Sequence, residues 1–194
     1  GYNSPIYRRY VSVGGEAKYG YVTNGERTVA TGLQKTDFSR GRFYNGSGGA
    51  RILGSGTDTT WWLFGGPATL GLPASDELPA VDGRYFLSTT NKVVSHDGRN
   101  GGVISGTWLN AWHQGGGTQN IRLGAAAGNV VTVRGGQAQP FTRGTLYAAT
   151  GGPAITVTGG IRAAYNAAGS VNSSLRMPTS NEFVWKGGIR QNYQ

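Results

Sequence analysis

Glycine pairs interrupt the chain along its whole length, and they constrain the fold more than any other feature of the sequence. The pairs stand at 14–15, 48–49, 65–66, 101–102, 135–136, 151–152, 159–160 and 187–188, with a triplet at 115–117. Glycine makes up 35 of the 194 residues, and it destabilises helix interiors, so a helical protein is disfavoured. The missing G-X-Y period excludes collagen, and an aromatic content of 11% is too high for a disordered tail. These features predict a β protein rich in turns.

The segments between the glycines are short, and many are β-branched or alternate between apolar and polar residues. Such segments are typical of strands joined by tight turns, and strands are predicted at 7–13, 51–53, 59–64, 120–123, 130–134, 145–149 and 154–158. Asn24-Gly25 and Asn45-Gly46 predict type I′ turns, because both central residues of that turn need a positive φ. Residues 160–168 fit a helix or a strand, and the preceding glycine pairs favour the strand. The predicted class is all-β, with glycine-rich short antiparallel strands in a sandwich-like arrangement.

Proline and charge divide the chain unevenly. Residues 67–83 contain three of the 7 prolines and are typical of an extended connector. We therefore predict an N-terminal β domain at 1–66, a connector and shaft-like segment at 67–98, and a basic C-terminal β domain at 99–194. Residues 1–98 carry a net charge of +2 and residues 99–194 a net charge of +7, out of +9 in total. The C-terminal half is thus expected to meet an anionic partner.

Metal and cofactor chemistry have little support. The chain has no cysteine, and its two histidines form no spacing typical of metal ligands, so we expect no metal. A phosphate-binding glycine loop is missing, and no cofactor is expected. Ser95-His96-Asp97 are adjacent, whereas catalytic triads are assembled from distant segments, so exposed turn histidines are favoured. No apolar run approaches the roughly 18 residues of a membrane span, so no membrane insertion is expected.

Tryptophan provides the sharper indication of a binding site. Trp61 and Trp62 are adjacent on a predicted strand, so at most one of them is expected to enter the core. Trp108 and Trp112 are four residues apart and would share a strand face, next to His113 and Gln114. Exposed tryptophan beside such polar groups is typical of sugar sites, while burial in a core or subunit interface is the equally weighted alternative.

Arginine dominates the basic residues of the second half, and it is spread about one per strand. Scattered arginine is unlike a nucleic-acid stripe, so no nucleic acid is expected. Arginine binds carboxylate and phosphate bidentately, which suits anionic glycans. We therefore predict ligand contacts from Arg122, Arg134 and Arg143, with ordinary solubility charge as the alternative.

Residues 80–161 carry a resemblance to a known family. The segments are Val103-Ile-Ser-Gly-Thr-Trp-Leu-Asn-Ala-Trp-His-Gln114, then Gln119-Asn-Ile-Arg-Leu-Gly124, then Thr156-Val-Thr-Gly-Gly-Ile161. Together with Pro79-Ala-Val-Asp-Gly-Arg-Tyr-Phe-Leu87, this order resembles the C-terminal receptor-binding tip of tail fibres from tailed bacteriophages and prophages. The closing residues 187–194 differ from the polar strand that commonly ends such tips.

The resemblance implies an intertwined homotrimer attached to the rest of a fibre. It implies a virion protein, assembled in the host cytoplasm, that binds a bacterial surface polysaccharide or outer-surface protein without catalysis. Many weak sites would then act together by avidity.

Three alternatives stay open from the sequence. A polysaccharide depolymerase needs two facing carboxylates, and eight acidic residues in 1–98 keep that possibility open, while the second half holds only Glu182. A pilus-tip adhesin and a head fibre or decoration protein would have the same composition.

Overall fold

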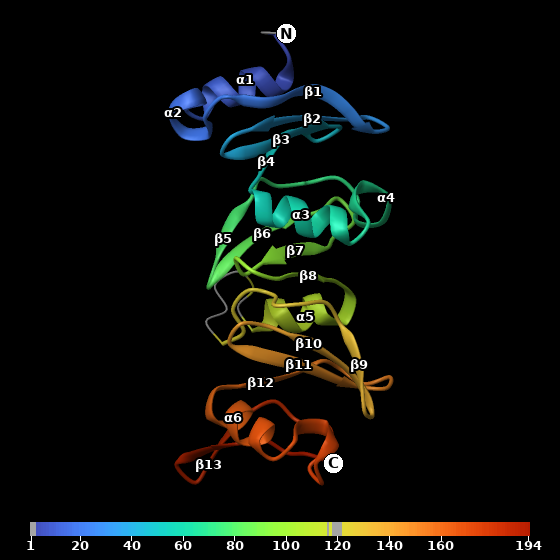
Figure 1. Ribbon diagram of the computed structural model, residues 1–194. Coiled ribbons are helices and arrows are strands. Elements are labelled where there is room, and N and C mark those ends of the chain that lie inside the picture. Colours follow the sequence, from blue (N-terminus) through green and yellow to red (C-terminus); the bar gives the residue numbers. More distant parts are fainter. Residues whose placement is uncertain (1–2, 116, 118–121) are drawn as a thin grey trace.

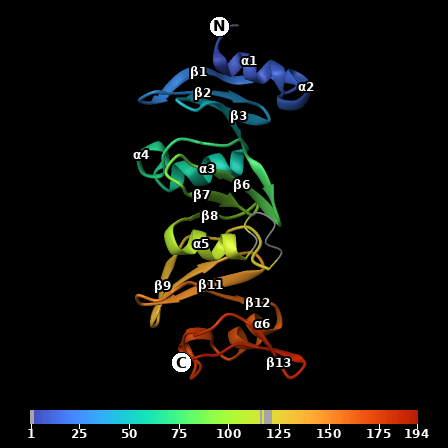
Figure 2. The same ribbon diagram turned by 180° about the vertical axis from the view of Figure 1, so that it is seen from behind.

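The molecule is a column in which helix layers and sheet layers alternate (Figure 1). This computed structural model describes residues 3–115, 117 and 122–194. The two termini lie at opposite ends of the column, and the view from behind has the same order of layers (Figure 2). Strands make up 39% and helices 26% of the structure. The predicted antiparallel β-structure is confirmed, but the all-β class is too narrow, because helices separate the sheets.

Each sheet is a meander in which strands pair antiparallel with their neighbours in sequence. The first sheet contains β1 (Val22–Ala30), β2 (Leu33–Phe38), β3 (Gly41–Gly46) and β4 (Gly49–Leu53). The second contains β5 (Leu78–Ala80), β6 (Gly83–Leu87), β7 (Val93–His96) and β8 (Gly101–Ile104). The third contains β9 (Val131–Val133), β10 (Gly136–Pro140), β11 (Gly144–Ala149) and β12 (Ile155–Thr158). β13 (Phe183–Trp185) and β14 (Gly188–Arg190) form a two-stranded sheet at the C-terminal end.

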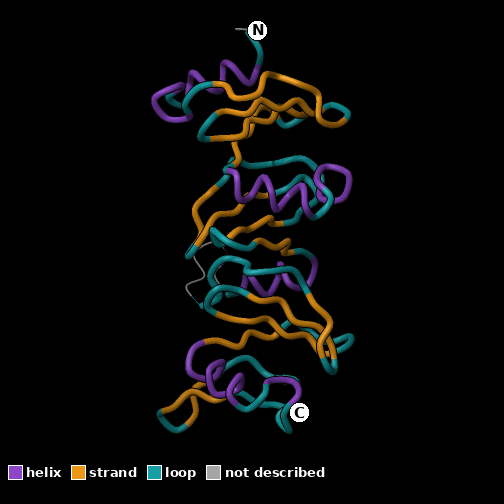
Figure 3. Tube along the Cα trace, in the orientation of Figure 1, coloured by secondary structure: helices purple, strands orange, loops and turns teal. Residues whose placement is uncertain are grey.

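Helices cover the N-terminal end of the first sheet and occupy the layers between the sheets (Figure 3). They are α1 (Pro5–Ser12), α3 (Ser55–Leu63), α5 (Gly106–Gln114) and α6 (Gly159–Ala167), together with the short α2 (Gly15–Tyr19) and α4 (Gly66–Leu70). The strands predicted at 7–13 and 59–64 are wrong, because these residues belong mainly to α1 and α3. The strand favoured at 160–168 is also wrong, because α6 covers almost all of it.

Local signals and burial explain why these segments are helical. Ser4 caps α1 by accepting a hydrogen bond from the Tyr7 N–H at 3.1 Å, and Pro5 occupies its first turn. In α5, Trp108 and Trp112 are four residues apart and therefore lie on one face of the helix. Packing of such a face between two sheets outweighs the weak helix propensity of glycine and threonine.

The other predicted strands and turns have mixed outcomes. Strands are confirmed within 51–53, 130–134, 145–149 and 154–158. The strand predicted at 120–123 lies partly outside the described residues, and its described part, 122–123, is a turn. Both type I′ turns are wrong. Asn24-Gly25 lies inside β1 and Asn45-Gly46 ends β3, and none of these residues has a positive φ. The paired strand ends place the actual turns at 31–32 and 47–48.

The column is a tandem repeat that the glycine pattern alone did not reveal. The third residue from the end of α1, α3, α5 and α6 is aromatic in each helix, at intervals of 51, 51 and 53 residues. These residues are Tyr10, Trp61, Trp112 and Tyr165. We number the repeats 1 (5–54), 2 (55–105), 3 (106–158) and 4 (159–194). Successive repeats are turned about the column axis, since α2 lies at the left of Figure 1 and its counterpart α4 at the right.

A glycine pair reverses the chain after each of the first two helices. Gly65 and Gly66 have φ of 104° and 52°, a left-handed conformation that favours glycine. A Cβ at Gly66 would lie 2.9 Å from Cε3 of Trp62, so the close approach also requires glycine. The glycine pairs at these positions therefore separate the two helices of repeats 1 and 2, and they are not hairpin turns.

Each helix layer shares a hydrophobic core with the sheet or sheets beside it. In β3, Phe43 packs in the core around α1, whereas the next residue, Tyr44, packs in the core around α3. Leu146 and Tyr147 divide in the same way between the cores of α5 and α6. Adjacent residues of a strand face opposite ways, so each of these sheets contributes to two cores.

An amide or carboxylate side chain connects each repeat to the next. Asp76, Asn129 and Asn181 accept hydrogen bonds from backbone N–H groups of the preceding repeat, at 2.9, 2.6 and 2.9 Å. Gln139 and Gln191 are both buried and donate to strand carbonyls of the preceding repeat at 2.9 Å. These bonds satisfy backbone groups that no sheet partner reaches.

Replacing Asn129 by alanine is expected to lower the free energy of unfolding by about 1–3 kcal/mol, because it leaves the Val103 N–H without an acceptor. Urea unfolding followed by circular dichroism measures the change. Asn110→Ala on the exposed side of α5 is the matched control and should change stability by less than about 0.5 kcal/mol. Equal effects of the two substitutions would contradict a linking role for Asn129.

The predicted domain boundaries fall inside repeat 2. The boundary at 66/67 lies within α4, and the one at 98/99 lies in the turn between β7 and β8. Residues 67–83, predicted as an extended connector, contain most of α4 and all of β5. Among the described residues, no helix is long and apolar enough to cross a membrane.

Candidate functional site

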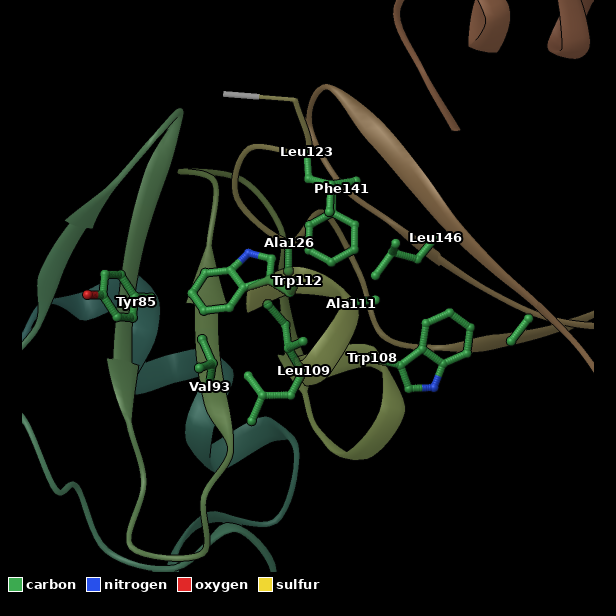
Figure 4. Packing of buried hydrophobic residues seen from close by; sticks show 12 residues of the cluster. Tyr85, Val93, Trp108, Leu109, Ala111, Trp112, Leu123, Ala126, Phe141 and Leu146 are labelled. Atoms are coloured by element: carbon green, nitrogen blue, oxygen red, sulfur yellow. The ribbon is translucent and has the colours of Figure 1, made fainter. Parts of the chain in front are cut away.

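The tryptophans predicted to bind a ligand lie in the core. Trp108 is 8% and Trp112 2% exposed, and both point between the second and third sheets, near Leu109 and Phe141 (Figure 4). The prediction placed them on one face of a strand, but α5 turns them into a layer with a sheet on each side. Neither ring is open to a sugar.

The polar residues of that prediction are dispersed. His113 and Gln114 are exposed at the end of α5, and Arg134 is exposed in the turn after β9. Arg122 forms an ion pair with Glu182, and Arg143 forms one with Asp82. The structure therefore does not gather the predicted ligand contacts into one site.

Trp61 and Trp62 divide as expected, although on a helix. Trp61 is fully buried and Trp62 is 39% exposed. The indole N–H of Trp62 donates to the hydroxyl of Tyr44 at 2.7 Å, which fixes the exposed ring against repeat 1.

A groove on the side of the column, at repeats 1 and 2, is the best candidate for a binding site. It consists of two adjoining cavities of about 410 and 530 Å³ that share Gly54, Glu77 and Arg84. We call the two together the side groove. Its upper part lies between α1, α2 and β5, and it includes Lys18 and Arg40. The lower part lies between the start of α3 and two turns of the second sheet.

The acids of the upper part are bound within the protein. Asp76 forms an ion pair with Arg9 at 2.5 Å and accepts the Ile52 N–H at 2.9 Å. Glu77 accepts the hydroxyl of Thr57 at 2.6 Å and the backbone N–H of Gly54 at 3.1 Å. Glu77 thereby caps α3, where a negative charge is favourable.

The acids of the lower part are also engaged. Hydrogen bonds from Arg143, at 2.5 and 2.9 Å, lower the pKa of Asp82. Burial acts to raise the pKa of Asp97, but hydrogen bonds from the backbone N–H groups of Asn100 and Arg99 outweigh it and lower that pKa. Both carboxyls are held ionised, which is the opposite of what a general acid needs.

The bases of the groove are more available. Lys18 and Arg84 are exposed and form no ion pair with any described residue, and Lys18 lies only over the ring of Tyr19, at 5.2 Å. The Nδ1 atom of His96 accepts the Gly98 N–H at 2.9 Å, so the proton of the neutral ring is on Nε2. A Cβ at Gly56 would lie 2.6 Å from that Nδ1, so glycine is needed where the ring meets α3. The groove thus offers hydrogen-bond donors to an anionic ligand.

Acid should weaken the fold through Asp97. A carboxyl whose pKa is lowered by folding stabilises the protein above its ordinary pKa of about 3.9, and this contribution disappears as the pH falls through the lowered value. We expect Asp97→Ala to have a lower Tm than the wild type at pH 6, with the two values converging towards about pH 2. Thermal unfolding followed by circular dichroism at several pH values measures this. A Tm difference that stays constant down to pH 2 would argue against an ionised Asp97 as the cause.

Among the described residues, no group of three or more His, Cys, Asp or Glu side chains could hold a metal ion. The exposed Lys18, Arg84 and the Nε2 proton of His96 suit binding by hydrogen bonds and charge. The groove was not predicted from the sequence, because the excess of basic residues in 99–194 placed the expected ligand contacts in that half. The recurring aromatic spacing could have revealed the repeats and so the junction between them.

The fold and the groove define a β-rich tandem-repeat column with a polar groove on its side. The family model of the LGFP repeat matches residues 123–173, about a quarter of the chain. The match begins at Leu123-Gly124, continues through the third sheet and α6, and ends after the short 3-10 helix at Ser170–Asn172. It therefore spans one period of the column. No curated protein matches the chain.

Proposed function

We propose that the protein is a non-enzymatic module that binds a bacterial surface polysaccharide in the side groove. The observation that carries this proposal is that the acids of the groove are engaged by protein groups, whereas two of its bases have no ion pair among the described residues. The acids are Asp76, Glu77, Asp82 and Asp97, and the two bases are Lys18 and Arg84. A carboxylate or phosphate on a polymer would provide the missing partners.

The LGFP match supports a surface role. This repeat is cell-wall-associated in some bacterial proteins. The excess charge of +9 would draw the module towards anionic wall polymers at low salt. Assignment to a phage tail fibre, and the homotrimer that this implies, stay predictions. Binding in the groove does not depend on them, because one chain fills all four cores.

A depolymerase is the enzymatic alternative, since Glu77, Asp82 and Asp97 line one cavity. The lowered pKa of Asp82 and of Asp97 favours binding over cleavage, because hydrolysis needs one carboxyl that stays protonated.

Sedimentation with purified bacterial cell walls tests the proposal. We expect the protein to sediment with the walls and to be released as salt rises from about 0.05 to 0.5 M, because screening weakens its contacts with anionic groups. Walls stripped of their anionic polymer are the control. Protein that stays in solution with intact walls would refute the proposal. Shortened polymer chains with the wild type, but not with Asp82→Asn or Asp97→Asn, would favour the depolymerase.

A further inference from the structure

We propose that a linear anionic polymer lies along the axis of the column in the side groove, with one acidic group at Arg84 and another at Lys18. This inference rests on the proposed function and adds the direction of the polymer and the points at which its charges bind. It follows from the way in which the two parts of the groove are joined.

The two parts of the groove adjoin at the junction of repeats 1 and 2. Gly54, Glu77 and Arg84 line both of its parts. Gly54 is the residue between β4 and α3, so it stands at the boundary of the two repeats. A Cβ there would lie 2.6 Å from a carboxylate oxygen of Glu77, so only glycine leaves room between the two parts of the groove. A ligand that occupies both parts must therefore extend along the column.

The donors follow one another along that path. Lys18 lines only the upper part, Arg84 lines both parts, and His96 lines only the lower part. Their order is therefore Lys18, Arg84, His96. The Nε2 proton of His96 suits a hydroxyl or carbonyl oxygen, while the two cations suit acidic groups. The acids that line the groove beside these donors would repel a ligand that is negatively charged along its whole length. A polymer whose acidic groups are separated by neutral units fits better.

The next repeat junction lacks this combination. The counterparts of Lys18, Arg84 and Glu77 at that junction are Thr69, Gln137 and Val130. Two cations are thus replaced by neutral side chains. Anion binding is therefore expected at the junction of repeats 1 and 2.

Length-sorted polymer provides the test. Anionic polymer released from purified bacterial cell walls is sorted by length, and its affinity is measured by titration against the folded full chain. Arg84→Ala is expected to weaken binding of every fraction by roughly tenfold, because it removes a charged hydrogen bond. Lys18→Ala is expected to weaken only fractions long enough to reach both parts. Arg134→Ala is the matched control, an exposed arginine outside the groove, and should change the affinity by less than about twofold.

The outcomes separate this inference from the function itself. If the wild type binds walls but Arg84→Ala behaves like Arg134→Ala, the inference is wrong and the proposed function stands. If Lys18→Ala weakens the shortest and the longest fractions equally, the polymer does not extend along the groove. If the wild type does not bind walls at all, the proposed function and the inference fall together. Thermal unfolding of each variant verifies that a lost affinity is not a lost fold.

Discussion

Replacing Lys35 by methionine is expected to lower the free energy of unfolding by about 3–5 kcal/mol, because it removes the cation nearest to the buried carboxylate of Asp58 and leaves only Arg42, at 4.0 Å. Lys35 is 8% exposed, and its ammonium nitrogen lies 3.0 Å from Asp58 and 3.3 Å from Asp37. Asp58 also accepts the hydroxyl of Tyr44 at 2.5 Å. These groups lie between the first sheet and α3, so the loss should loosen repeat 1 from repeat 2. Urea unfolding measures the change.

A second variant separates charge from packing. In Lys35→Met/Asp58→Asn the amide oxygen still accepts from Tyr44, while the charge of Asp58 is gone. Asp37 keeps its ion pairs with Arg27 and Arg42. Most of the lost stability should return, since a buried ion pair replaced by neutral groups is often neutral for stability. Lys92→Met is the matched control, because the ammonium group of Lys92 donates to the carbonyl of Thr69 at the surface and forms no ion pair with a described residue. A double variant as unstable as the single one would contradict an electrostatic cause.

Tyr44 takes part in this network as a hydrogen-bond donor. Burial, together with the neighbouring charge of Asp58, raises the pKa of the Tyr44 hydroxyl far above its ordinary value. The hydroxyl therefore keeps its proton across the pH range in which the protein folds, and it can donate to Asp58 throughout.

Replacing Trp112 by alanine is expected to cost about 3–5 kcal/mol of stability, because the indole fills the core between the second and third sheets. Binding to cell walls, measured below the Tm of the variant, should be unchanged, since the ring lies outside the side groove. Trp185→Ala on the exposed C-terminal hairpin is the control and should have little effect on stability. If a folded Trp112→Ala protein no longer bound cell walls, α5 would be part of the binding site after all.

The charge pattern illustrates how a linear division can mislead. The sequence assigns an excess of +7 to residues 99–194, yet Arg143 of that half pairs with Asp82 of the other half. Arg122 pairs with Glu182. Two of the three arginines chosen as anion contacts are thus engaged with acids. The available bases of the groove, Lys18 and Arg84, come from residues 1–98, whose net charge is only +2.

The presence of several short antiparallel strands was determined by the sequence itself, although both predicted type I′ turns were misplaced. Alternating and β-branched segments separated by glycine favour strands locally, because side-chain crowding and turn geometry act over a few residues. The strands at 145–149 and 154–158 needed no further information.

The helices, the stacking and the groove were decided only by tertiary structure. A pair such as Trp108 and Trp112 fits one face of a strand or of a helix, and burial between two sheets selects the helix. Which base is left without an acid depends on residues distant in sequence, as Asp82 and Arg143 are. Local propensity carries no information about such pairs, because they meet only when the repeats stack.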